Sequence, residues 1–224
     1  MNNPIVDDSV QDFWPLKPWL ASRNDDVLVW LGNTKAGHGS NVPVCKARGR
    51  INLPPRALVD FLLDSSRIRE YNAMSQGRED LLMIQESLDT TAEESKFGIP
   101  GMCKIIRSKN KPKLLPKVVE MTSLMYAKPL KSLPGSYLVV NRSIHKDATG
   151  ELKSTKDTMI TEMLLGANLI RPVGEDGQMS EFSTITHAFA PGVPAMLARK
   201  AAPGSATNMI KEIQKLFDTE KNTE

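Results

Sequence analysis

Six strand-like runs follow one another between residues 79 and 190, and they constrain the fold more than any other feature of the sequence. Each run is rich in apolar residues and is bounded by Gly, Pro, Asn or Asp, which favour turns. Short turns between consecutive runs are typical of an antiparallel meander. The runs cover residues 79–87, 101–109, 117–127, 136–145, 157–172 and 180–190. The sequence therefore predicts a large antiparallel sheet.

Helical patterns flank this strand-rich region on both sides. Two further strands are predicted at 26–32 and 42–52, and a helix over 54–72 opens with prolines that a first turn accepts. At the other end, apolar residues recur at helical spacing over 190–217. Pro203 and Gly204 interrupt this last helix, either as a hinge over a moving lid or as a static kink. The predicted fold class is α+β, with the closing helix packed against a curved antiparallel sheet.

Composition excludes several classes of protein. The 224 residues are 40% hydrophobic and 25% charged, which is ordinary for a globular protein, and a net charge of +3 is too weak to indicate nucleic-acid binding. Cys45 and Cys103 form no disulfide framework and are expected to be free thiols. No apolar run is long enough to span a bilayer, and residues 1–20 lack the features of a signal peptide. We expect a cytoplasmic protein.

Searching the sequence for catalytic chemistry gives nothing specific. His38, His145 and His187 are far apart, and no metal-ligand, phosphate-loop or nucleophile motif is present. We therefore predict no catalytic residue, no metal and no cofactor. Asn141 and His187 interrupt apolar strand faces. Each is either a solvent-facing or satisfied buried residue, or a polar group that faces a mostly apolar ligand pocket.

A run of basic residues follows Met102. Solvated loop is one interpretation of it, and docking on anionic lipid headgroups is the other. Nucleic acid is disfavoured because no aromatic residues interleave with the basic ones. The residues concerned are Lys104, Arg107, Lys109, Lys111 and Lys113. A transient membrane contact is thus a prediction, and protein partners stay unknown.

Five segments together resemble the StAR-related lipid-transfer (START) family over residues 25–217. They read VDFLLDSSRIREYNAMSQGRE, KNKPKLLPKVVEM, GSYLVVNRSIHKD, LLGANLIRP and ITHAFAPGVPAML, in that order. The resemblance implies a helix-grip fold whose tunnel holds one sterol, phospholipid, ceramide or similar lipid for transport between membranes. It also implies that the protein is not an enzyme. Residues 1–24 are then an N-terminal segment and 218–224 a polar tail.

Site residues are carried over from the matching motifs. Asn141 matches a strand position that presents an asparagine to the lipid head group in ceramide-transfer members, and His187 matches a tyrosine position. Arg107 or Ser108 matches a polar contact less closely. For the apolar wall we predict Val139, Phe189, Met196 and Met209. Lys117 and Val118 replace the family's usual Arg-Asp pair, so the identity of the lipid does not transfer.

Two alternatives from other classes stay open. The same fold in polyketide cyclases and aromatases carries acid–base chemistry, for which His187, Glu162 and Arg107 are the candidates here. A lipid-sensing regulatory module is the other alternative.

Overall fold

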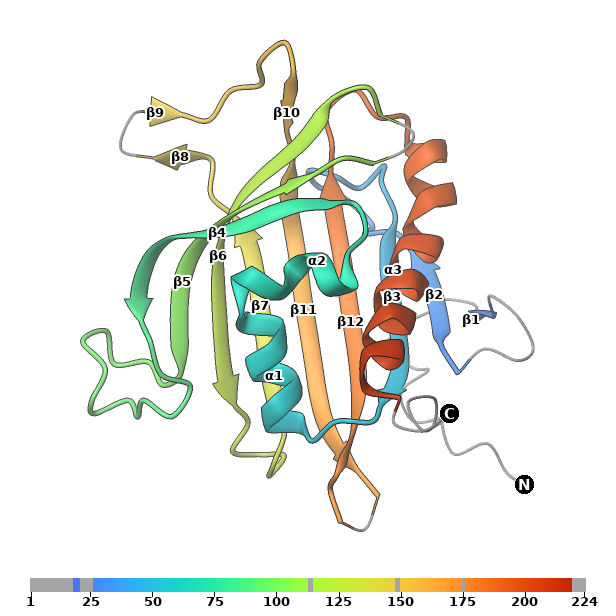
Figure 1. Cartoon of the computed structure of the whole chain (residues 1–224). Helices are drawn as coiled ribbons and strands as arrows, with labels where there is room; N and C mark the ends of the chain where they lie inside the picture. The colour runs from blue at the N-terminus through green and yellow to red at the C-terminus, as the bar shows by residue number, and fades with distance from the viewer. Residues whose placement is uncertain (1–17, 21–25, 113–114, 148–149, 175, 219–224) are drawn as a thin grey trace.

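A large, strongly curved antiparallel sheet dominates the computed structural model (Figure 1). The structure describes residues 18–20, 26–112, 115–147, 150–174 and 176–218. Ten strands form the sheet in the order β1-β2-β3-β12-β11-β7-β6-β5-β4, with β10 pairing in parallel with β6. They are β1 (Pro18–Leu20), β2 (Leu28–Gly32), β3 (Val44–Ile51), β4 (Ser75–Gln85), β5 (Met102–Asn110), β6 (Val118–Pro129), β7 (Tyr137–Ser143), β10 (Thr158–Ile160), β11 (Glu162–Val173) and β12 (Met179–Phe189).

The helices all lie on one side of the sheet, which we call the concave face (Figure 1). Helix α1 (Pro55–Leu63) and the short α2 (Ile68–Tyr71) cover the centre, where α1 packs on β7, β11 and β12. Helix α3 (Ala195–Phe217) packs on β2 and β3. A small ribbon of β8 (Lys146–Asp147) and β9 (Gly150–Glu151) stands apart. The predicted α+β class and helix-grip architecture are confirmed.

The core lies between α3, α1 and the concave face. Gly49 of β3 allows α3 to approach the sheet closely, because a Cβ there would lie 2.6 Å from Cγ2 of Ile210. Aromatic rings join the helices to one another: Phe61 of α1 lies 5.1 Å from Tyr71 and 5.2 Å from Phe217 between ring centroids. Burial of these large apolar groups is the main driving force that holds the helices against the sheet.

One of the two predicted helices differs from the structure. The helix predicted over 54–72 ends at Leu63, because the Asp64 side chain accepts hydrogen bonds from the backbone N–H and the hydroxyl of Ser66 and starts a new turn. Helix α3 runs without a break in its helical assignment from Ala195 to Phe217, with Pro203 inside it, so the choice between a hinge and a static kink at Pro203 stays a prediction. Pro203 is buried, so packing of its ring on the domain offsets the hydrogen bond that proline removes.

Candidate functional site

The alternation of side chains along the central strands decides which of them face the helices. Val139 of β7 pairs with Ala127 of β6 and with Asn168 of β11. Both Val139 and Ala127 belong to the buried core under the helices. Residues two positions apart point to the same side of a sheet. Asn141 therefore also faces the concave side.

Asn141 holds a buried polar atom with nothing to bind. Its Oδ1 is buried and has no hydrogen-bond partner among the residues that the structure describes. The side chain lies across Gly166 of β11, where a Cβ would come within 2.1 Å of Oδ1. The absence of a side chain at Gly166 therefore leaves space for the side-chain amide of Asn141. A buried acceptor without a partner costs about 1–3 kcal/mol, so a ligand that donates a hydrogen bond here would relieve that cost.

Thr207 of α3 presents a second such atom. Its Oγ1 is buried without a partner in the described part of the chain, and the residue as a whole is only 5% exposed. Pro203 and Ile210 are buried on the same side of the helix. Sequence reasoning missed Thr207, although a lone hydroxyl in an otherwise apolar helical stripe was the signal that could have found it.

The other polar residues on this side of the central strands are neutral as well. Cross-strand pairing places Thr184 of β12 beside Asn168 of β11, and Ser123 of β6 lies two residues from Met125, the partner of Asn141. Thr184 and Ser123 are 3% and 2% exposed. The concave face therefore carries hydroxyl and amide groups within an apolar surround, which suits recognition of an uncharged polar group.

Lys104, predicted to belong to a membrane-facing patch, is instead inside the protein. It is 2% exposed, and its Nζ donates to the backbone oxygen of Leu63 at 2.7 Å and pairs with Asp80 at 2.8 Å. Burial lowers the pKa of the Lys104 ammonium, which the hydrogen bond and charge of Asp80 partly offset. This part of the prediction is wrong, because the period of two in β5 turns Lys104 inward.

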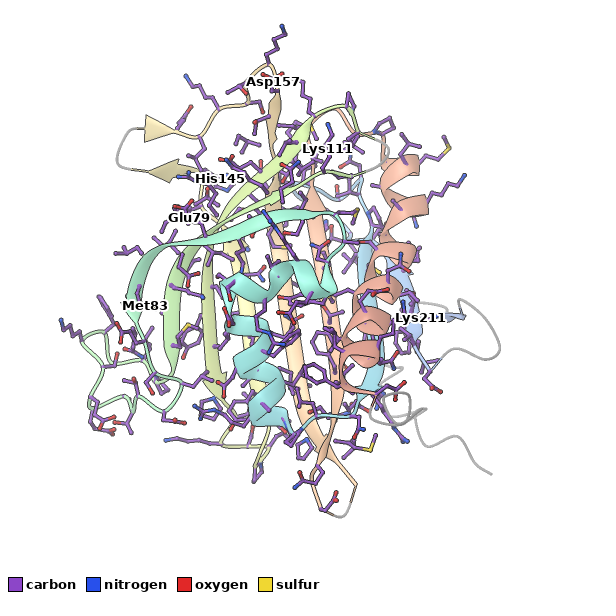
Figure 2. The ribbon with its side chains drawn as sticks, viewed as in Figure 1. Glu79, Met83, Lys111, His145, Asp157 and Lys211 are labelled. Atoms are coloured by element: carbon purple, nitrogen blue, oxygen red, sulfur yellow. The ribbon has the colours of Figure 1, made fainter. Side chains whose placement is uncertain are left out.

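The rest of the basic run is divided among different surroundings. Arg107 and Lys109 point to the opposite, convex face, where Glu120 lies 3.9 Å and 3.5 Å from their nitrogens. Lys111 lies at the upper end of the sheet in Figure 2, and its Nζ donates to the backbone oxygen of Pro116. Lys113 lies outside the described residues. Membrane contact by Arg107, Lys109 and Lys111 stays a prediction.

His187 also faces the convex side. Thr186 pairs with Cys45, a member of the core under the helices, so the next residue along β12 points away from that core. His187 is 5% exposed and its Nε2–H donates to the backbone oxygen of Gly39 at 3.0 Å. The histidine therefore binds the 33–43 segment to the sheet.

Phe189 lies on the convex side with it. The ring of His38 contacts Phe189 at 4.7 Å between centroids, and His38 Nε2–H donates to Glu162 at 2.8 Å. Both contacts are made by His38, which belongs to the 33–43 segment that covers the convex face. Arg107, His187 and Phe189 are thus separated by the sheet from Asn141.

The two predicted methionines of α3 lie in different environments. Met209 is partly buried against the core, whereas Met196 in the first turn is 76% exposed. Of the predicted set, the structure brings Val139, Asn141 and Met209 to the concave side of the sheet.

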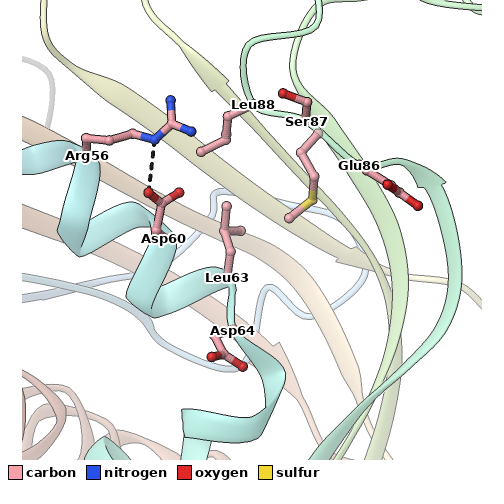
Figure 3. Close-up of a pocket in the computed structure, with 8 residues that line it drawn as sticks. Arg56, Asp60, Leu63, Asp64, Glu86, Ser87 and Leu88 are labelled. Atoms are coloured by element: carbon pink, nitrogen blue, oxygen red, sulfur yellow. Dashed lines mark hydrogen bonds and ion pairs between the residues drawn. The ribbon is translucent and has the colours of Figure 1, made fainter.

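A surface pocket of about 350 Å³ lies between α1 and the chain that follows β4 (Figure 3). Its lining mixes charged and apolar residues: Arg56, Asp60, Leu63, Asp64, Glu86, Ser87, Leu88 and Met102. Arg56 Nε donates to Asp60 at 3.0 Å, and its Nη1 binds Asp89 at 2.7 Å. Among the described residues no group of three or more His, Cys, Asp or Glu could hold a metal ion, and no helix is long and apolar enough to cross a membrane.

Solved structures with the same arrangement of helices and strands settle the fold. Human StAR-related lipid transfer protein 5 superposes with a TM-score of 0.71 at 13% identity, covering 94% of this chain and 90% of that one. The lipid transfer and protein localization domain of human StarD13 gives 0.68 at 13% identity, covering 97% and 98%. This chain has the START fold.

A bacterial START structure agrees. The STAR-related lipid transfer protein from Xanthomonas axonopodis gives a TM-score of 0.68 at 12% identity and covers 91% of this chain and 99% of that one. No protein-family model and no curated protein sequence matches the chain. At such low identities the START resemblance is established for the fold, and function has to be argued from the residues.

Proposed function

We propose that this START-fold protein binds one lipid between α3 and the concave face of the sheet and carries it between membranes. The observation that supports this most is that two of the three buried side-chain atoms without partners among the described residues, Asn141 Oδ1 and Thr207 Oγ1, lie on the sheet and helix that enclose the core, whereas the third, Arg48 Nε, lies on the convex face. The first two come from the sheet and from the helix that a helix-grip fold closes around its ligand. The similar solved structures bear the names of lipid transfer proteins.

Physical chemistry explains the need for such a carrier. Moving each CH₂ into water costs about 0.8 kcal/mol, so a lipid with roughly 30 methylenes faces a barrier above about 20 kcal/mol. A protein interior that replaces the acyl environment removes most of this barrier. The few polar groups in the interior then select the head group, because an unpaired buried donor or acceptor costs about 1–3 kcal/mol.

The polar groups favour an uncharged head group that donates a hydrogen bond. Asn141 Oδ1 can only accept, so its ligand partner is a hydroxyl or an amide N–H. The cations on this side of β4 and β5, Lys104 and Arg78, are bound to the chain's own groups: Asp80 and the backbone oxygens of Leu63 and Leu62. A phosphate would enter such an interior without a counter-charge, at high cost. Sterols and ceramides have the required chemistry.

The remaining predicted residues divide accordingly. In this proposal Val139 and Met209 contribute to the apolar wall, and the exposed Met196 at the start of α3 contacts the bilayer. Arg107, His187 and Phe189 are left out of the lining because they point to the convex face. The acid–base alternative loses support for the same reason, since His187 and Glu162 are engaged with the 33–43 segment.

A liposome transfer assay tests the proposal. The delipidated protein should accelerate movement of fluorescent ceramide or sterol from donor to acceptor vesicles by about tenfold or more over the protein-free rate, and phosphatidylcholine far less. Protein-free vesicles and a heat-denatured sample are the controls. Stoichiometric binding without transfer would favour the sensing module, and neither binding nor transfer of any lipid would refute the proposal.

A further inference from the structure

Strand β4 leaves one edge of the sheet open. It pairs with β5 on one side, and no other strand of the described residues pairs with its second side. Three consecutive residues at its middle are exposed: Leu81 by 37%, Leu82 by 54% and Met83 by 40%. Figure 2 shows Met83 at the outer margin of the molecule, away from the helices. Such an apolar sheet edge readily associates with another chain.

The loop after β4 enlarges this apolar surface. Phe97 is 62% exposed and Ile99 is 44% exposed, and both lie on the connection from β4 to β5, below β4 in Figure 1. We call Leu81, Leu82, Met83, Phe97 and Ile99 the edge patch. Exposed apolar side chains on one strand edge and on the loop that follows it favour an interaction surface over scattered exposure.

Charge is distributed unevenly along the edge. The end of β4 and the following loop carry more exposed acidic than basic residues: Glu86, Glu93, Glu94 and Asp89, which pairs with Arg56, against Lys96. The start of β4 lies beside basic residues of β5 and of the chain that follows it, which Glu79 and Glu120 partly balance: Arg107, Lys109 and Lys111. The edge is therefore basic at one end, apolar in the middle and acidic at the other.

This distribution is complementary to itself. A two-fold axis through the middle of β4 sets two copies antiparallel, so the basic end of each copy meets the acidic end of the other and the apolar centres coincide. An anionic bilayer would be repelled by the acidic loop beside Phe97 and Ile99. We propose that the edge patch is the dimer interface of this protein, with a second copy of the chain as its occupant.

The geometry of β4 defines how the two copies meet. Its register with β5 shifts between Asp80 and Leu82 and again between Met83 and Gln85. Bulges of this kind twist an edge and limit regular strand pairing. The dimer is therefore held mainly by apolar side chains around Leu82 and by the charges at either end.

Sedimentation equilibrium of the full chain over a wide concentration range tests the interface. We expect a reversible monomer–dimer equilibrium whose Kd rises about tenfold or more in Leu82→Lys and rises with added salt. Leu133→Lys is the matched control, because Leu133 is 42% exposed outside the patch, in the turn between β6 and β7. Its Kd should equal that of the wild type.

Phe97→Ser supplies a second variant in a loop, where misfolding is not a concern, and circular dichroism checks the fold of each. A chain that stays monomeric at every concentration would overturn the proposal, as would a dimer that Leu82→Lys and Phe97→Ser both leave intact. Monomeric protein that binds vesicles through Leu82 would also overturn it, and would assign the patch to a membrane.

Discussion

Replacing Asn141 with leucine is expected to stabilise the lipid-free protein and to weaken lipid binding at the same time. The buried Oδ1 has no partner in the described structure, so removing it relieves a cost of about 1–3 kcal/mol. The same change removes the acceptor for the lipid's head group, and the affinity should fall roughly 5- to 150-fold. Thr207→Val, which removes the unpartnered hydroxyl of α3 with little change of shape, should act in the same two directions.

Chemical denaturation of the delipidated protein measures the change in its free energy of unfolding. Ceramide or sterol transfer measures the loss of lipid binding. His187→Leu is the control, because it removes a buried hydrogen bond to Gly39 on the convex face. That variant should lose stability but keep the lipid preference of the wild type. If Asn141→Leu behaved like His187→Leu, with lower stability and unchanged selectivity, Asn141 would be a structural residue and the head-group assignment would be wrong.

Glu181→Gln should destabilise the fold more than any substitution at the exposed ion pairs. Glu181 of β12 lies on the convex face between Arg48, with which it pairs directly, and Arg171, whose Nε donates to it at 3.0 Å. The side chains of Glu181 and Arg48 are 9% and 8% exposed. Removing one partner of a buried ion pair leaves the opposite charge buried and unpaired, here that of Arg48 and Arg171, and costs about 3–5 kcal/mol. Glu212→Gln, at an exposed helical pair with Lys215, should change stability little.

The same carboxylate predicts how stability depends on pH. Burial would raise the pKa of Glu181, but hydrogen bonds from Arg171 and Arg48 outweigh it and hold the pKa below its ordinary value of 4.5. Its stabilising contribution is therefore complete above about pH 4.5 and is lost as the pH falls through the lower, folded-state value. Urea titrations between neutral and acidic pH should show a steeper acid loss in the wild type than in Glu181→Gln. Parallel curves would contradict this account.

The fold could be predicted from the sequence because its signals are local. Each strand can be recognised from its apolar composition and from the turn residues on either side of it. Strands β3, β5, β7 and β12 lie within a few residues of the predicted runs. The C-terminal helix was also predicted, and it continues through Pro203. Helix propensity penalises Pro203 locally, whereas the burial that offsets the penalty is a tertiary effect that the sequence pattern does not show.

The faces of the strands were harder to predict. In β12 the apolar Ile185 and Phe189 flank His187, and the pattern looked like an inner face. The 33–43 segment covers the convex side at this point, so apolar residues occur on both faces and alternation alone cannot tell them apart. Neighbouring residues of β12 point to opposite faces, so Thr186 faces the concave side and His187 the convex side.

Lys104 shows a different limit. Its neighbours in sequence are basic, which is typical of a solvated or membrane-facing run, while its partner Asp80 is 24 residues away. Pairing of β4 with β5 creates that contact. Thr207 was overlooked because a single hydroxyl on a helix is usually unremarkable, and only burial without a partner distinguishes it.

Photo-cross-linking with a diazirine-bearing ceramide or sterol, followed by peptide mapping, tests most directly whether a lipid binds between α3 and the concave face. We predict that label is concentrated in peptides that contain Asn141, Gly166 or Thr207, and that excess unlabelled lipid removes it. Label confined to the 33–43 segment of the convex face, or to the edge patch around Leu82, would contradict the proposed location of the lipid.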